Sequence, residues 1–369
     1  MPKQAIEKVY SILRPDGSCK DQYVTLISDS ELLKVIETIV FSRLFETKMM
    51  LLQRQGRVGF SLTSTGEEAT IIGSAFCLNP NDPLFLSYRE LGALLWRGVP
   101  TPLILNQFMG NDHDLCKGRQ MPVHYCYKEY FIPSVSAPVG TQLTHACGYG
   151  YASKLQKTGQ VSLAFLGEGT ASGSNFHAAL NFGGVLKSPC IFVIRNNGYA
   201  ISTPESIQTA AESLSSRAEG YGIMGIQIDG NDLLAVIKAI QEAVKRARQG
   251  LGPTLIEAMT YRLGAHSSSD SPEDYRGQDE TKAWELYDPL DRLIKHAQWR
   301  HALPDTWLEK TQSHLQQQLE NDIEACEHWS EPSINTMFEE TYETTPIHLA
   351  EQRDNYLSFL SRNESSQTL

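Results

Sequence analysis

The chain lacks an excess of basic residues, and it lacks a long apolar run. Its 369 residues include 32 Lys and Arg against 43 Asp and Glu, which gives a formal net charge of −11 and a sequence pI of about 5.4. An acidic chain of this kind offers no basic face to neutralise phosphates, so bulk electrostatics excludes nucleic acid as a partner. No stretch approaches the roughly 20 apolar residues that span a bilayer, so we expect no membrane partner either.

Cysteines at metal-binding spacing are also absent. The seven cysteines are dispersed along the chain, and none forms a CxxC motif. Dispersed cysteines in a chain of this length are typical of reduced thiols. The start, MPKQAIEKVY, has neither an apolar secretory core nor an Arg- and Ser-rich transit pattern. We therefore expect a cytoplasmic protein.

Composition and patterning predict an α/β domain with an extension at each end. Hydrophobic residues make up 41% of the chain and charged residues 20%, which are ordinary values for a folded protein. The mixed residues 1–27, interrupted by Gly and Pro, are interpreted as an N-terminal arm, and residues 28–280 as the α/β domain. Polar helical patterns fill residues 281–363, and the polar residues 364–369 are expected to be a disordered tail.

Short apolar runs rich in β-branched residues alternate with helical patterns in the middle of the chain. The strands are expected at residues 161–167, 190–196, 226–228 and 254–261, and the helices between them at 173–186 and 231–248. An earlier helix is expected from a capping box at Ser28 and Glu31 to about Gln55. Alternating strands and helices indicate a parallel sheet covered on both faces. In such sheets ligands bind beyond the carboxyl ends of the strands.

The first of these strands ends in a glycine-rich turn that contains an acid, Gly167-Glu168-Gly169. It resembles a dinucleotide fingerprint, but Ser172 stands at the third glycine position, and a carboxylate would repel a diphosphate unless a cation lay between them. The next strand ends in Asn196-Asn197-Gly198-Tyr199. Glu168, the Asn197 side-chain oxygen and the Tyr199 carbonyl would together give Mg²⁺ three of its six oxygen ligands. We therefore predict a metal-bridged diphosphate at these strand ends.

The whole stretch from Gly167 to Asn197 resembles the thiamin-diphosphate motif, which starts with Gly-Asp/Glu-Gly and ends in Asn-Asn. Further motifs flank it in the order LSYRE (86–90), KGRQMPVHY (117–125), SAPVGTQ (136–142), NNGYAISTP (196–204) and YRLGAHSSSD (261–270). Together they resemble the α subunit of the decarboxylating component of 2-oxo acid dehydrogenase complexes, over roughly residues 30–345. The strings GRQMPVHY and NNGYAISTP are most similar to the branched-chain (2-oxoisovalerate) members.

The resemblance implies a thiamin-diphosphate-binding α/β fold and assigns site residues by motif position. The cofactor residues implied are Tyr88, Arg89 and Arg195 at the diphosphate, Gly169 and Thr170 as backbone donors, and Ala137 and Val139 near the pyrimidine. His266 matches the active-site histidine. As imidazole titrates near neutral pH, we expect it to take part in acyl transfer by proton transfer or electrostatically.

A structural K⁺ site is also implied by the resemblance, formed by Ser136, Pro138, Thr141 and Gln142. A plain helix N-terminus after Pro138 is the alternative reading of this segment. His124 is left open between a second active-site histidine and a packed one. Ser267 lies where mitochondrial relatives are phosphorylated, but Gly277 replaces their second serine, so we expect an unregulated loop.

The implied reaction is oxidative decarboxylation of a branched-chain 2-oxo acid, followed by acyl transfer to the lipoyl arm of a partner acyltransferase. The resemblance also implies a β subunit in a two-α, two-β heterotetramer, without which the chain is an incomplete enzyme. Pyruvate dehydrogenase and an acetoin-cleaving relative share these motifs and remain alternatives. From a different class, the chain could be a catalytically silent structural subunit of a multienzyme complex.

Overall fold

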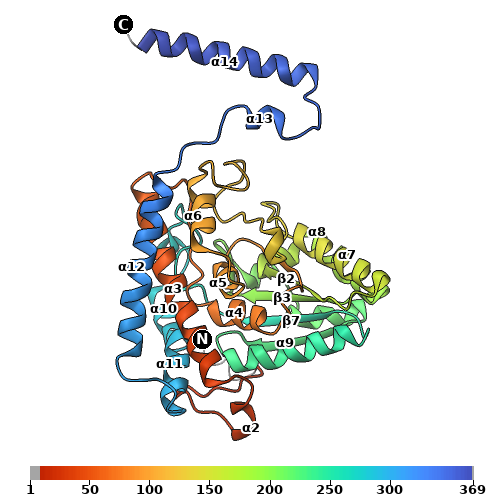
Figure 1. Ribbon diagram of the computed structural model, residues 1–369. Coiled ribbons are helices and arrows are strands. Elements are labelled where there is room, and N and C mark those ends of the chain that lie inside the picture. Colours follow the sequence, from red (N-terminus) through yellow and green to blue (C-terminus); the bar gives the residue numbers. More distant parts are fainter. Residues whose placement is uncertain (1–8, 368–369) are drawn as a thin grey trace.

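A sheet of five parallel strands lies at the centre of the structure, a computed structural model that describes residues 9–367, with side chains up to Arg362 (Figure 1). In spatial order the strands are β1 (Leu84–Phe85), β2 (Ser162–Gly167), β3 (Cys190–Asn196), β7 (Thr254–Met259) and β6 (Met224–Asp229). The parallel sheet and the four longer strands are as predicted, with bounds that shift by one or two residues.

Helices cover both faces of this sheet, because the strands are apolar on both sides. Alternate β2 residues enter different cores: Leu163 and Phe165 face one, Ala164 and Leu166 the other. The first core is closed by α3 (Asp29–Arg54), α4 (Glu68–Phe76), α5 (Leu91–Trp96) and α9 (Leu233–Arg248). The second is closed by α7 (Thr141–Gln156), α8 (Ser174–Leu186) and the 3-10 helix η4 (Ser215–Tyr221). The predicted fold class is confirmed.

Local chemistry explains where several helices begin. The Ser28 side chain accepts a hydrogen bond from the Glu31 N–H, and the Glu31 side chain accepts one from the Ser28 N–H, which is the predicted capping box of α3. Asp232 caps α9 by accepting from the N–H groups of Leu234 and Ala235. Its other carboxylate oxygen accepts from the Ile12 and Leu13 N–H groups at 2.5 and 2.6 Å. One carboxylate therefore caps a helix and holds the described part of the N-terminal stretch.

Strand register brings the carboxyl ends of three strands together. Gly167 of β2 pairs with Arg195 of β3, which pairs with Ala258 of β7. Beyond these ends lie the 3-10 helix η2 (Glu168–Ser172) and a small antiparallel pair, β4 (Tyr199–Ala200) and β5 (Thr203–Pro204). The remaining short segments are α2 (Asp21–Val24), η1 (Lys128–Tyr130), η3 (Glu205–Ile207) and η5 (Pro272–Asp274).

The C-terminal part of the described chain is helical. It comprises α10 (Gln278–Glu285), α11 (Pro289–Trp299), α12 (Trp307–Glu327), α13 (Thr336–Glu339) and α14 (Ile347–Gln367), while α6 (Thr101–Met109) packs beside α12. The prediction of a disordered tail is wrong for residues 364–367, which continue α14 because each added residue extends the existing hydrogen-bond ladder. Residues 368–369 and the first eight residues of the arm lie outside the described part.

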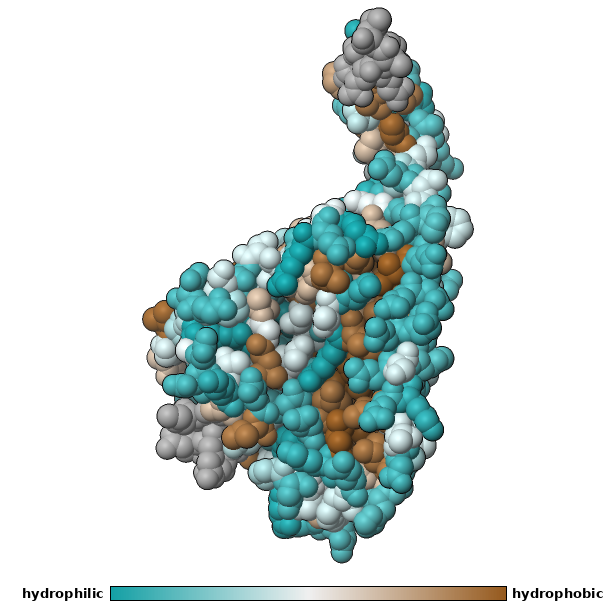
Figure 2. Space-filling model, turned by 90° about the vertical axis from the view of Figure 1, so that its left-hand side faces the viewer, coloured by the Kyte–Doolittle hydropathy of each residue, from teal (hydrophilic) through white to brown (hydrophobic). Residues whose placement is uncertain are grey.

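An apolar groove of about 390 Å³ runs between α3 and α12, lined by Val40, Leu44, Leu51, Leu308 and Leu319 among others. Figure 2 shows apolar side chains gathered in a hollow on this side of the molecule. Within residues 9–367, no helix combines the length and the apolarity that a membrane crossing requires.

Candidate active site

A cavity of about 420 Å³ opens at the carboxyl ends of the strands, where the sequence predicted ligand binding. Its walls include the predicted metal residues Glu168, Asn197 and Tyr199. They also include the predicted cofactor residues Tyr88, Arg89, Ala137, Val139, Gly169, Thr170, Arg195 and His266. Residues from six separate motifs therefore meet in one pocket. The K⁺ candidates lie outside its walls.

Glu168 is the buried carboxylate of this pocket, with 3% of its surface exposed. Burial, with the Glu67 carboxylate adding to it, raises its pKa to about 7. The neighbouring Gly169 approaches another strand closely, since a Cβ built there would lie 2.5 Å from the Ala200 Cβ. The glycine therefore lets η2 pack closely on β4, and this packing forms a cradle that holds the Glu168 carboxylate in the pocket wall.

The two other predicted metal residues, Asn197 and Tyr199, line the same pocket as Glu168. The Asn197 side-chain oxygen accepts from the Tyr199 N–H at 3.2 Å, and its amide nitrogen donates to Glu67 at 2.6 Å. No cluster of three His, Cys, Asp or Glu side chains that could hold a metal occurs in the described part of the chain. A metal ion here would depend on one carboxylate with amide and carbonyl oxygens, a donor set that fits Mg²⁺.

Arg89 and Arg262 bring two buried cations to the same pocket, with 3% and 2% of their surfaces exposed. Arg89 donates to the carbonyl oxygens of Thr63 and His266, and Arg262 to the Ile201 carbonyl and the Tyr275 hydroxyl. Among the described residues, neither guanidinium forms an ion pair with a carboxylate. Burying an unpaired charge is costly, so this pocket is built to receive an anion.

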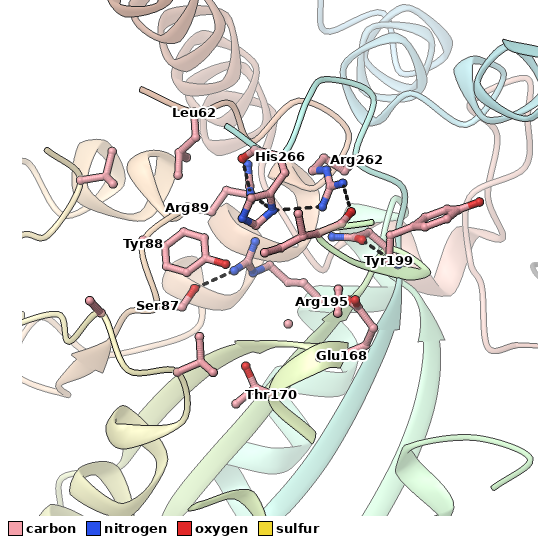
Figure 3. Close-up of a pocket in the computed structure, with 18 of the residues that line it drawn as sticks. Leu62, Ser87, Tyr88, Arg89, Glu168, Thr170, Arg195, Tyr199, Arg262 and His266 are labelled. Carbon is pink, nitrogen blue, oxygen red and sulfur yellow. Dashed lines mark hydrogen bonds between the residues drawn. The ribbon is translucent and has the colours of Figure 1, made fainter. Parts of the chain in front are cut away.

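Arg195 differs from these two arginines, because its charge is already balanced. Its guanidinium pairs with Glu67 and, at 2.6 Å, with Glu90, and it donates to the Ser87 hydroxyl at 2.8 Å. Burial raises the pKa of Glu67, but the neighbouring Arg195 and Arg89 guanidinium groups lower it by more. The pKa of Glu67 therefore lies below its ordinary value. Arg195 therefore faces the pocket as part of a neutralised buried network (Figure 3).

His266 lies between the two unpaired arginines (Figure 3). Its Nδ1 is 3.3 Å from Arg89 Nη2 and 3.3 Å from Arg262 Nη1. Guanidinium groups only donate, so Nδ1 accepts and the ring carries its proton on Nε2. Burial and then the two arginines lower the pKa of His266 to about 4. This direction differs from the expectation that the imidazole titrates near neutral pH, because burial and two neighbouring cations both oppose a positive charge on the ring.

The aromatic ring of Tyr88 completes this part of the wall. Its centroid lies 6.2 Å from that of His266 in an edge-to-face arrangement, and the Arg89 guanidinium lies 5.7 Å from it. Such contacts fix the direction of the ring and of the cation beside it.

The predicted K⁺ residues form a hydrogen-bonded turn at the start of α7. The Thr141 hydroxyl donates to the Pro138 carbonyl at 2.9 Å, and the Gln142 amide oxygen accepts from the Gly140 N–H at 3.1 Å. The Ser136 and Thr141 hydroxyls lie 3.5 Å apart. These bonds are also what a helix start provides without an ion, so the K⁺ site stays a prediction.

Sequence reasoning missed several residues of this site. Ser87 and Glu90 lie within the quoted LSYRE motif and Arg262 within YRLGAHSSSD, so their motif positions were a usable signal. Glu67 sits in Gly66-Glu67-Glu68, where no periodicity or spacing distinguishes it from a surface acid. Its role follows from its contacts with Arg195 and Asn197, which only the folded chain creates.

Comparison with known proteins places the chain in a class. Residues 37–335 match the family described as Dehydrogenase E1 component, and the chain belongs to this family. Family membership implies the use of thiamin diphosphate, which the buried cations and the Glu168 cradle can accommodate.

Particular relatives carry a more specific name. The chain is 39% identical over 340 residues to the Homo sapiens mitochondrial 2-oxoisovalerate dehydrogenase subunit alpha, covering 91% of this chain and 74% of that protein. It is 38% identical over 353 residues to subunit alpha 1 of the Arabidopsis thaliana enzyme, covering 93% and 73%. The Dictyostelium discoideum protein of the same name is 38% identical over 355 residues, covering 95% and 80%.

Proposed function

We propose that this chain is the α subunit of a 2-oxo acid dehydrogenase that decarboxylates branched-chain 2-oxo acids. The observation that supports it most strongly is the pair of unpaired buried arginines, Arg89 and Arg262, in one pocket with the buried carboxylate of Glu168. Two buried cations without an ion pair suit an anionic cofactor and substrate, and a carboxylate beside them suits a bridging Mg²⁺. A silent structural subunit would need none of these buried charges.

The pocket residues would divide the binding of Mg²⁺–thiamin diphosphate between them. Tyr88, Arg89, Gly169 and Thr170 would hold the diphosphate, and Glu168, Asn197 and Tyr199 the metal ion. Ala137 and Val139 would contact the ring portion. When bound, the cofactor supplies the carbon nucleophile and electron sink that decarboxylation requires.

His266 would act on the substrate side as a neutral hydrogen-bond donor. With Nδ1 accepting from the two arginines, its proton is held at Nε2. A neutral ring can donate a hydrogen bond from Nε2 to an oxygen that gains negative charge, which stabilises that charge while the proton stays on Nε2.

Apolar side chains near these groups favour an aliphatic substrate. Phe60, Leu62, Met121 and Val123 line the pocket together. A branched side chain buries more apolar surface there than the methyl group of pyruvate, and each added methylene is worth about 1–3 kcal/mol of discrimination. The names of the relatives from Homo sapiens and Arabidopsis thaliana point in the same direction.

The partners proposed are a β subunit, in a two-α, two-β heterotetramer, and a lipoyl-bearing acyltransferase. Several apolar side chains at the pocket are half exposed in this chain, including Met121, Val139 and Ile201. A second subunit that covered them would keep water from the reacting groups. The cytoplasmic location, the K⁺ site and the unregulated Ser267 loop stay predictions.

The deciding experiment uses this chain co-purified with its β subunit. Reduction of an artificial electron acceptor would be followed with 3-methyl-2-oxobutanoate or pyruvate, each with and without thiamin diphosphate and Mg²⁺. Faster cofactor-dependent turnover of the branched acid is the expected result. Preference for pyruvate would transfer the proposal to pyruvate dehydrogenase, and no cofactor-dependent rate with either acid would refute it.

A further inference from the structure

One wall of the active-site pocket has an unusual backbone conformation. Met121, Val123 and His124 line the pocket, and Val123 adopts φ +67°. Positive φ is disfavoured for a β-branched residue, and such a conformation costs on the order of 1–3 kcal/mol. The segment therefore needs partners that hold it in place.

The partner is a glutamine on a neighbouring helix. Gln107 of α6 is 2% exposed and does not line the pocket. Its Nε2 donates to the Met121 carbonyl at 2.7 Å, and its Oε1 accepts from the Val123 N–H at 3.0 Å. A carboxamide offers one acceptor and two donors on one rigid plane, so a single side chain satisfies both backbone groups on either side of Pro122.

The residue that follows the strained position presents an unused polar atom. His124 is 5% exposed, and its Nδ1 lies 3.2 Å from the Pro122 carbonyl, to which it can only donate. In the neutral ring Nε2 is then an acceptor, and this buried atom has no hydrogen-bond partner among the described residues. Such an atom in a pocket wall is expected to meet a ligand or a water.

We infer that Gln107 is a positioning residue for the substrate: it clamps Met121 and Val123 and thereby sets the place of the Met121 and His124 side chains in the pocket. The inference rests on the proposed function, because its kinetic consequence is measured with a 2-oxo acid. The clamp itself can be tested without any substrate.

A second hydrogen bond to the same helix offers a matched control. The Tyr127 hydroxyl donates to the Leu103 carbonyl of α6 at 3.2 Å. Tyr127→Phe removes one hydrogen bond between α6 and this segment but leaves both Gln107 bonds in place. Gln107→Met removes both clamp bonds while nearly keeping the side-chain volume, so it avoids a cavity.

The first measurement is hydrogen–deuterium exchange on the chain assembled with its β subunit, without substrate. Gln107→Met should speed exchange in peptides covering residues 120–126 by about tenfold or more, since the Val123 amide loses its acceptor. Tyr127→Phe should leave the Val123 amide as slow as in the unaltered chain. Equal protection in the Gln107→Met and unaltered proteins would overturn the clamp, even if no 2-oxo acid proves to be a substrate.

The second measurement is steady-state kinetics with 3-methyl-2-oxobutanoate. Gln107→Met should raise KM about tenfold and leave the Kd for thiamin diphosphate within about twofold, because the cofactor residues are untouched. Tyr127→Phe should change neither. An unchanged KM, or a loss of cofactor affinity as large as the rise in KM, would overturn the positioning role.

Gln107→Glu supplies a pH-dependent rescue. A protonated carboxyl has one donor and one acceptor and can restore the clamp, whereas a carboxylate can only accept and would face the Met121 carbonyl. Relative to the unaltered enzyme at each pH, the KM of this variant should fall as the pH is lowered from 8 to 6, and that of Gln107→Met should not. A constant KM ratio for Gln107→Glu would contradict the clamp geometry.

Discussion

At the residue scale, charge balance in the pocket depends on which buried groups have a partner. Arg195 forms ion pairs with Glu67 and Glu90, whereas Arg89 and Arg262 form no ion pair in the described chain and interact with Glu67 only at longer range. The same pocket raises the pKa of Glu168 to about 7 and lowers that of His266 to about 4. In both cases the environment of the free protein disfavours the charged form of the side chain. A cation bound near Glu168 or an anion bound near His266 would move each pKa back towards its ordinary value.

Glu168→Ala tests the metal assignment. The variant should weaken Mg²⁺-dependent binding of thiamin diphosphate by about 100-fold or more, since it removes the one carboxylate among the proposed ligands. Isothermal titration calorimetry at fixed Mg²⁺ measures this. Glu242→Ala removes an exposed carboxylate on α9 and serves as the control. Unchanged affinity in Glu168→Ala would remove this residue from the metal site.

Arg262→Gln tests what keeps His266 neutral. Loss of one neighbouring cation should raise the pKa of His266 from about 4 towards its ordinary value of 6.5, by about one unit. An NMR pH titration of the histidine ring protons reads this directly, with Arg262→Lys as the charge-conserving control. If the two variants titrate alike, the charge of Arg262 does not contribute to the shift.

The sign of the associated stability effect follows from the same shift. Because the folded-state pKa lies below 6.5, the unfolded chain takes up this proton first as the pH falls. The contribution of neutral His266 to stability is therefore fully present above pH 6.5 and is lost as the pH falls towards 4.

At the element scale, α7 has one face that packs against the rest of the protein and one face that is exposed. This helix carries a run of small residues, Ala146, Gly148, Gly150 and Ala152, and such a run can serve either tight helix packing or a subunit contact. Ala146 and Gly150 are buried, and Gly148 and Ala152 are exposed. The run therefore belongs to two faces, and tight packing explains only one of them.

Alanine substitutions at the two glycines should have opposite effects on the free energy of unfolding. A Cβ at Gly150 would lie 2.6 Å from Ser188 Oγ and 3.0 Å from the Pro189 carbonyl, so Gly150→Ala should destabilise by about 1–3 kcal/mol. At Gly148 a Cβ meets nothing within 4 Å, so Gly148→Ala should stabilise the separate α chain by about 0.5–1 kcal/mol. Urea unfolding of both variants measures these changes, and equal effects would contradict the assignment of faces.

At the scale of the whole molecule, the C-terminal helices divide between the body and an extension. α12 buries Leu315, Leu319 and Ile323 against the core, whereas Figure 1 shows α14 standing away from the sheet and its covering helices. Most helical stability in proteins comes from such packing, so the two helices should contribute very differently to folding.

Truncation tests this division. Removing residues 347–369 should change the Tm of the α chain by less than about 2 °C, as expected for a segment that adds under about 1 kcal/mol. Removing everything from Trp307 onward also deletes α12 and should prevent cooperative unfolding. Differential scanning calorimetry distinguishes these results, and a large fall in Tm on the shorter deletion would show that α14 supports the body.

The sequence alone determined the parallel α/β fold and the position of the site at the strand ends. Strand and helix periodicities indicate burial on two faces of the sheet. Glu168 and Asn197 directly follow strands, and His266 lies in the loop after β7, where parallel topology gathers them. These are local patterns whose meaning does not depend on distant contacts.

Only the tertiary structure decided the electrostatics and the support of the site. The low pKa of His266 arises from burial and then from two arginines, of which Arg89 reaches it from a distant segment and Arg262 lies four residues before it. The balance of the Arg195 charge requires Glu67 and Glu90. Gln107 holds Val123 from a helix that does not line the pocket. Burial, charge partners and hydrogen bonds to the backbone depend on which residues lie close together in space. The order of residues along the sequence does not show these contacts.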